Sequence, residues 1–179
     1  GATDLGASTV SGTLGITSGG AVTDSGTLAI TGATTISASG QDITLDEAAS
    51  TFGTLALTGA NVAVTDAGAT DLGASTVSGT LGITSGGAVT DSGTLAIPGT
   101  TTFSACGQDI TLDVAASTFG TLVLTGANVA VTDAGATDLG ASTVSGTLNV
   151  TSAGAVTDSG TLAITGATTI SASSQDITL

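Results

Sequence analysis

The chain repeats itself closely, and this limits its fold more than any other feature. The ten residues GATDLGASTV begin at Gly1 and return at Gly68 and Gly135, a period of 67 residues in a chain of 179. The second copy differs from the first at six positions, and the third stops after 45 residues. A fixed period of this kind indicates a stack of similar units. We therefore expect one solenoid domain over residues 1–179, an excerpt of a longer array, with repeats 1–67, 68–134 and 135–179.

Glycine divides each repeat further. Glycines open eight segments, spaced by 20, 27 and 20 residues; each is followed by an aliphatic residue at the fourth position and a second glycine at the sixth. Within a segment apolar residues alternate, as in Leu28-Ala29-Ile30. This alternation predicts short strands, and glycine between them predicts corners. The opening glycines are Gly6, Gly26, Gly53, Gly73, Gly93, Gly120, Gly140 and Gly160.

A unit of about 20 residues with roughly three short strands is the size of one coil of a parallel β-helix, whose coils stack about 4.8 Å apart. The sequence therefore predicts an all-β, single-stranded parallel β-helix (β-solenoid) of about eight coils of 20 residues. The 27-residue segments carry seven surplus residues, 46–52 and 113–119, which we interpret as an insertion in every third coil. A thin solenoid suits a chain with three Phe and no Trp, Tyr or Met. Phe103 replaces Ile36 in the next copy, so this position is expected in the interior of the solenoid. Asn61 and Asn128 are expected at a corner or bulge.

Composition excludes several classes of function. The chain has no Lys, Arg or His against 14 acidic residues, a net charge of -14. It cannot neutralise phosphates, so we expect neither nucleic acid nor an anionic membrane surface as a partner. No apolar run is long enough to cross a bilayer, and residues 1–20 lack the pattern of an export signal. The regularly placed aliphatic residues distinguish the chain from a disordered linker, and the single Cys106 has no internal disulfide partner.

Several stretches resemble secreted bacterial proteins. Residues 52–68, FGTLALTGANVAVTDAG, resemble the strand repeat of autotransporter passenger domains. The surrounding GTLAITGATTISASGQDITL and SGGAVTDSGTLAI are similar to filamentous-haemagglutinin-type exoproteins of two-partner secretion. The resemblance extends over essentially the whole chain. It implies a right-handed β-helical stalk of a surface-displayed adhesin, with an extracellular or cell-surface location. The secretion and receptor-binding regions of such proteins are not among these residues.

Aspartates two residues before an opening glycine are the candidate metal ligands. In adjacent coils they are expected to stack about 4.8 Å apart, where two carboxylates repel each other. Splaying into solvent would relieve the repulsion, and so would a Ca²⁺ ion, which takes carboxylate and carbonyl oxygens. No other cofactor is expected. The predicted calcium pairs are Asp4 with Asp24, Asp71 with Asp91, and Asp138 with Asp158.

The residues suggest two other kinds of site. Asp42, Asp46 and Glu47 gather near the surplus stretch, and a pair of carboxylates is what glycosidases need. Val114 replaces Glu47 in the next copy and aromatic sugar platforms are few, so we expect no enzyme. Regular ladders of Thr can bind ice, but the position after each second glycine is Thr in some segments and Ala in others, as at Thr13 and Ala33, which argues against a continuous ladder.

The sequence thus favours a structural repeat segment of an extracellular, surface-displayed bacterial adhesin stalk or fibre. The alternatives are a self-assembling filament subunit and, behind it, a carbohydrate- or ice-binding solenoid. The expected partners are neighbouring repeats, copies of the chain joined end to end, and a glycan or protein receptor. An all-acidic surface would keep such rods apart in solution.

Overall fold

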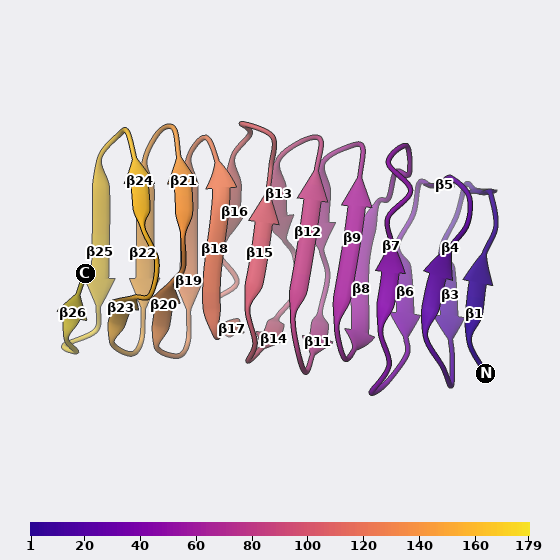
Figure 1. Cartoon of the computed structure of the whole chain (residues 1–179), viewed down its shortest axis with the longest axis horizontal. Coiled ribbons are helices and arrows are strands. Elements are labelled where there is room, and N and C mark those ends of the chain that lie inside the picture. The colour runs from indigo at the N-terminus through magenta and orange to yellow at the C-terminus, as the bar shows by residue number, and fades with distance from the viewer.

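The structure is a computed structural model that describes all 179 residues. It contains 26 short strands and no helix, so no helix could cross a membrane. The strands pair in parallel and stack along one axis, with the two termini at opposite ends of a rod (Figure 1). The predicted all-β parallel solenoid is confirmed, with about nine turns instead of eight. Nearer strands run upward and farther strands downward as the chain advances from right to left in Figure 1, which describes a right-handed coil.

Two twelve-stranded parallel sheets form the opposite walls of the rod. The first face consists of β1 (Thr3–Leu5), β4 (Val22–Asp24), β7 (Ile43–Leu45), β9 (Val62–Asp66), β12 (Leu81–Ser85), β15 (Thr101–Ser104), β18 (Thr121–Gly126), β20 (Thr137–Leu139), β21 (Ser142–Val144), β23 (Val156–Asp158), β24 (Leu162–Ile164) and β26 (Ile177–Thr178). The second face consists of β3 (Leu14–Thr17), β6 (Thr34–Ser37), β8 (Thr54–Gly59), β10 (Thr70–Leu72), β11 (Ser75–Val77), β13 (Val89–Asp91), β14 (Leu95–Ile97), β16 (Ile110–Leu112), β17 (Thr118–Phe119), β19 (Val129–Asp133), β22 (Leu148–Ser152) and β25 (Thr168–Ala172). A two-stranded sheet, β2 (Ser8–Val10) with β5 (Leu28–Ile30), completes the N-terminal turns.

The core is a single column of apolar side chains between the two faces. Along each strand alternate residues point inward, and 34 buried apolar residues form one continuous cluster. Ile36 and Phe103 are both buried, as expected for a position that accepts two apolar residues. Each fully buried aliphatic side chain contributes about 1.5 to 3 kcal/mol relative to exposure. Because each turn covers the next, this burial depends on stacking.

Equivalent strands of consecutive 67-residue copies lie on opposite faces. From β1 the chain crosses between the faces seven times, through β3, β4, β6, β7, β8 and β9, before it reaches the equivalent strand β10. Seven is odd, so β1 belongs to the first face and β10 to the second. Another seven crossings return β20 to the first face. One repeat is therefore three and a half turns, and an equivalent strand returns to the same face only after two repeats.

The predicted seven-residue insertion in every third coil is wrong. Gly53 does not stack on the previous opening glycine, Gly26: a Cβ added to Gly53 would lie 2.6 Å from the carbonyl oxygen of Gly32. Thr51 pairs with Ala29 in the ladder, and its amide donates to the carbonyl of Leu28 at 2.8 Å. Residues 46–52 therefore complete an ordinary turn. The 27-residue segments span one and a half turns, which also explains the additional turn.

Candidate functional site

The paired aspartates proposed as calcium ligands are out of register. Asp4 lies opposite Thr23, and Asp24 lies opposite Leu5. The same offset recurs in the second and third copies. The stacked residues are 19 apart here, whereas the glycines that guided the prediction are 20 apart. A shift of one residue sends neighbouring carboxylates to opposite sides of the sheet. The predicted stacking of Asp4 on Asp24, Asp71 on Asp91 and Asp138 on Asp158 is therefore wrong.

The outward aspartates bind hydroxyls of neighbouring turns. Asp71 accepts hydrogen bonds at Oδ2 from Thr54 Oγ1 and Ser92 Oγ, both at 2.8 Å, and at Oδ1 from Thr90 Oγ1 at 3.4 Å. Asp138 receives the equivalent three bonds. Asp4 has two of them, from the turn above it. These hydroxyls provide the donors that a carboxylate needs without a cation. Calcium binding stays a prediction whose geometric basis, the stacked pair, is gone.

The inward aspartates bind backbone amides that directly follow the paired strand of the next turn. Asp91 is buried, and its Oδ1 accepts hydrogen bonds from the amides of Asp113 at 2.8 Å and Val114 at 3.4 Å. Ser117 Oγ donates to Oδ2 at 3.4 Å. Burial raises the pKa of Asp91, the nearby Asp113 carboxylate raises it further, and the hydrogen bonds act in the opposite direction. Asp24 anchors the amides of the first copy in the same way.

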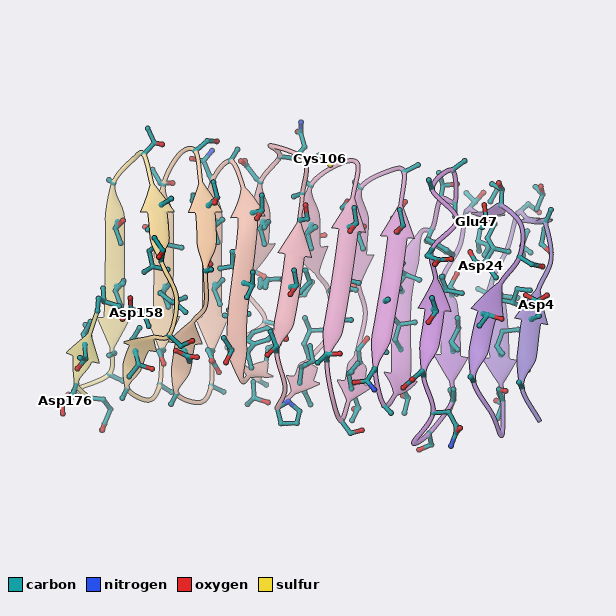
Figure 2. The ribbon with its side chains drawn as sticks, in the orientation of Figure 1. Asp4, Asp24, Glu47, Cys106, Asp158 and Asp176 are labelled. Atoms are coloured by element: carbon teal, nitrogen blue, oxygen red, sulfur yellow. The ribbon has the colours of Figure 1, made fainter.

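The third copy lacks this arrangement. Asp158, the equivalent of Asp91, is exposed. Figure 2 shows it near the C-terminal end of the rod, whereas Asp4 and Asp24 lie on neighbouring turns at the N-terminal end. The six predicted residues thus fall into two environments, one outward and hydroxyl-bound, the other inward and bound to backbone amides. Together they form no cluster of ligands: no group of three or more His, Cys, Asp or Glu side chains comes together anywhere in the chain.

Sequence reasoning missed the two most deeply buried carboxylates. Asp66 and Asp133 are each 1% exposed. Asp66 accepts hydrogen bonds from the amide of Gly68 at 2.9 Å and from Thr70 Oγ1 at 3.2 Å. Burial nevertheless raises the pKa of both groups above the ordinary value of 3.8. The alternation of Val62, Val64 and Asp66 places the aspartate on the inward side of its strand, so strand parity could have identified it.

An asparagine joins three turns at one corner of the rod. The backbone N–H of Asn61 and its side-chain Nδ2 both donate to Asp42 Oδ1, each at 3.0 Å. Its side-chain oxygen accepts from the amide and hydroxyl of Thr80, both at 3.1 Å. Asn128 makes the equivalent bonds in the second copy. The predicted corner position is confirmed, and the contacts assign these side chains a structural role.

The carboxylates near residues 46–52 do not form a catalytic pair in a cleft. Asp42 is bound to Asn61, and the backbone amide of Glu47 donates to Asp24 at 3.4 Å. The surface has no pocket. Glu47 lies among the N-terminal turns (Figure 2) and is half-buried. Cys106 is an exposed free cysteine in a turn with a φ of 44°. The arrangement can bind and stiffen neighbouring turns, and the expectation that the chain is no enzyme stays a prediction.

Fold and contacts together define a repeat protein of the parallel β-solenoid class, whose polar side chains mainly join one turn to the next. The chain belongs to the family described as repeats of unknown function (DUF5649), which matches residues 1–58, 59–125 and 126–179. The second and third matches begin 67 residues apart, which is the period found in the sequence. No curated protein and no solved structure matches the chain.

Proposed function

We propose that the chain is a rigid spacer, a repeat segment of the stalk or fibre of an extracellular, surface-displayed bacterial adhesin. The observation that carries this proposal is the pair of parallel ladders that runs along the whole rod. The ladders and corners contain 105 backbone hydrogen bonds, most of which lie between turns. Extension of the rod would break bonds in both walls at once, and bending would break those of the stretched wall, so the architecture resists load along its axis.

The surface chemistry suits exposure outside a cell. Fourteen acidic residues and no basic ones make neighbouring rods repel one another and stay dispersed. The absence of Lys and Arg also removes every site at which trypsin-like proteases cut. The likeness of residues 52–68 to autotransporter passenger repeats, and of the flanking stretches to filamentous-haemagglutinin-type exoproteins, supports secretion. A glycan or protein receptor would then be bound by another part of such an adhesin.

A self-assembling filament is the second candidate. The outermost turns of this segment pair with a neighbour on one side only, and an unpaired parallel edge is a template for another chain. Copies of the segment joined end to end would pair these edges.

Antibodies against the folded chain test the first proposal. They should label intact cells of the source organism, and immunogold particles should lie at a fixed distance from the outer surface. Removal of 134 residues, seven turns, from the full-length protein should draw the label inward by about 34 Å. Label that appears only after lysis contradicts the proposal.

Electron microscopy and sedimentation of the purified chain test the second. A filament should form above a critical concentration, and Ile177→Asp should prevent it because the charge would be buried in the junction. Thr44→Asp, a substitution on an outward-facing side chain of β7, away from both terminal strands, is the matched control. A chain that stays monomeric at high concentration leaves the stalk as the sole proposal.

A further inference from the structure

Strands without an outward charge gather in one block on each face. On the first face β9, β12, β15 and β18 are direct neighbours, each a single continuous strand (Figure 1). Their outward side chains are Ala, Gly, Val, Thr and Ser only. The outward aspartates Asp4 and Asp138 lie on strands before and after this block. A chain of net charge -14 therefore has a flat region without outward charges.

A column of hydroxyls runs through this block. Its five residues are in register on successive turns, at a spacing of about 4.8 Å. The adjacent outward column, which starts at Ala63, contains only small or β-branched residues. The hydroxyl column consists of Thr65, Thr84, Ser104, Thr125 and Thr143.

The hydroxyls of this column are not used by the protein. None of the five makes a hydrogen bond within the chain, whereas outward hydroxyls beside the aspartates do: Thr90 and Ser92 donate to Asp71. The β-branched threonines are held in few rotamers by the strand. The column therefore presents free donors and acceptors at fixed, repeated positions, next to methyl groups, on strands that carry no outward carboxylate.

These properties exclude the usual occupants of a flat surface. Four strands of about five residues cover roughly 300 Å², against about 800 Å² per partner in a stable protein complex. A second copy would also bring two polyanions together. The column has no aromatic side chain for sugar stacking and no cation for an anionic polymer. The class of partner that remains is a neutral, regular lattice that can form a hydrogen bond with each hydroxyl of the column.

We propose that the hydroxyl column binds ice. The fixed hydroxyls would hold a row of ordered waters at small entropic cost, and these waters would join the lattice of an ice surface. The interrupted positions after each second glycine, such as Thr13 and Ala33, lie at corners outside the strands and are not part of this column. The inference concerns surface chemistry and is independent of the stalk proposal.

The half-turn offset between repeats places the column on both sides of the rod. The second face carries the equivalent column of the first copy, Thr17, Ser37, Thr58 and Thr76. Further along the same face lie Thr132, Thr151 and Ser171. A test must therefore change every copy at once, and the equivalent residues Thr17, Thr84 and Thr151 allow this.

The test compares two triple variants by thermal hysteresis, ice-crystal shape and partition into growing ice. The column variant is Thr17→Lys, Thr84→Lys and Thr151→Lys. The control variant places the same three charges on outward positions of other strands, Thr44→Lys, Thr111→Lys and Thr178→Lys. We expect ice shaping and hysteresis from the native chain and the control, and their loss in the column variant.

Circular dichroism verifies that each variant folds. If the column variant with lysine does not fold, a version with glutamine at the same three positions replaces it. A native chain that neither shapes ice nor enters it overturns the proposal. Equal loss in both triple variants, or full activity of a folded column variant, also overturns it. A dimer in sedimentation that the column variant abolishes would assign the face to contacts between copies and overturn ice binding as well.

Discussion

Two buried threonines should weaken the native rod, and their replacement by valine should stabilise it. Thr34 and Thr101 occupy the same position in consecutive copies and are both 0% exposed. Their Oγ1 atoms have no hydrogen-bond partner. Thr34 lies in register with Leu14 on one side and Leu55 on the other, within the apolar column. Valine has nearly the same shape and no hydroxyl.

The magnitude follows from desolvation. A buried polar group left unsatisfied costs about 1 to 3 kcal/mol, so each substitution should raise the free energy of unfolding by about 1 kcal/mol or more. For a chain of this size that corresponds to about 2 to 4 °C per kcal/mol in melting temperature. The two sites lie on opposite faces and about 17 Å apart along the axis, so their effects should add.

The third copy supplies a matched control. Thr168 is the equivalent residue and is exposed, so Thr168→Val should leave the melting temperature nearly unchanged. Thermal and urea unfolding followed by circular dichroism would compare the three single variants and the Thr34→Val/Thr101→Val double variant. The reasoning is refuted if the two buried substitutions destabilise the chain, or if they do no more than Thr168→Val.

Four further outcomes are expected. Gly53→Ala should cost about 1 to 3 kcal/mol, because its Cβ would meet carbonyl oxygens of the turn before it; Gly12→Ala, with open space around it, should cost far less, and equal melting temperatures would contradict this. Asn61→Ala should lower stability by about 1 kcal/mol through lost contacts between turns, as measured by urea unfolding. Burial raises the pKa of Asp66 and Asp133, so the folded chain binds protons more tightly than the unfolded chain. The melting temperature should therefore rise as the pH falls from neutral through the raised pKa values toward 3.8, and a decrease across that range would refute the raised pKa of these two groups. Millimolar calcium should leave the melting temperature unchanged, since neighbouring hydroxyls already bind the outward carboxylates. A clear rise in melting temperature would show that calcium binds the folded chain.

The fold could be predicted because two periods in the sequence agree. Alternation along each strand determines which side chains face inward, and the 67-residue period requires similar units to stack. The same reasoning placed Ile36 and Phe103 correctly in the core. It worked because a solenoid uses local patterns that every turn repeats.

The register could not be predicted from glycine spacing alone. Stacked residues are separated by 17 positions at Thr54 and Asp71 and by 22 at Ala29 and Thr51. Corners absorb these differences, and the chain does not place a glycine at every corner. The glycine pattern therefore aligned Gly53 with Gly26 and one aspartate with another, and the candidate calcium site depended on that alignment. Strand parity, applied to the aspartates, would have separated them.

Three and a half turns per unit makes the rod sensitive to the parity of its copy number. Gain or loss of one 67-residue unit within an array would rotate everything beyond it by half a revolution about the axis, while gain or loss of two units would change length alone. A domain carried at the tip would then face either way according to whether the count is odd or even. Recombination between near-identical copies could thus reorient such a tip without changing a single residue of it.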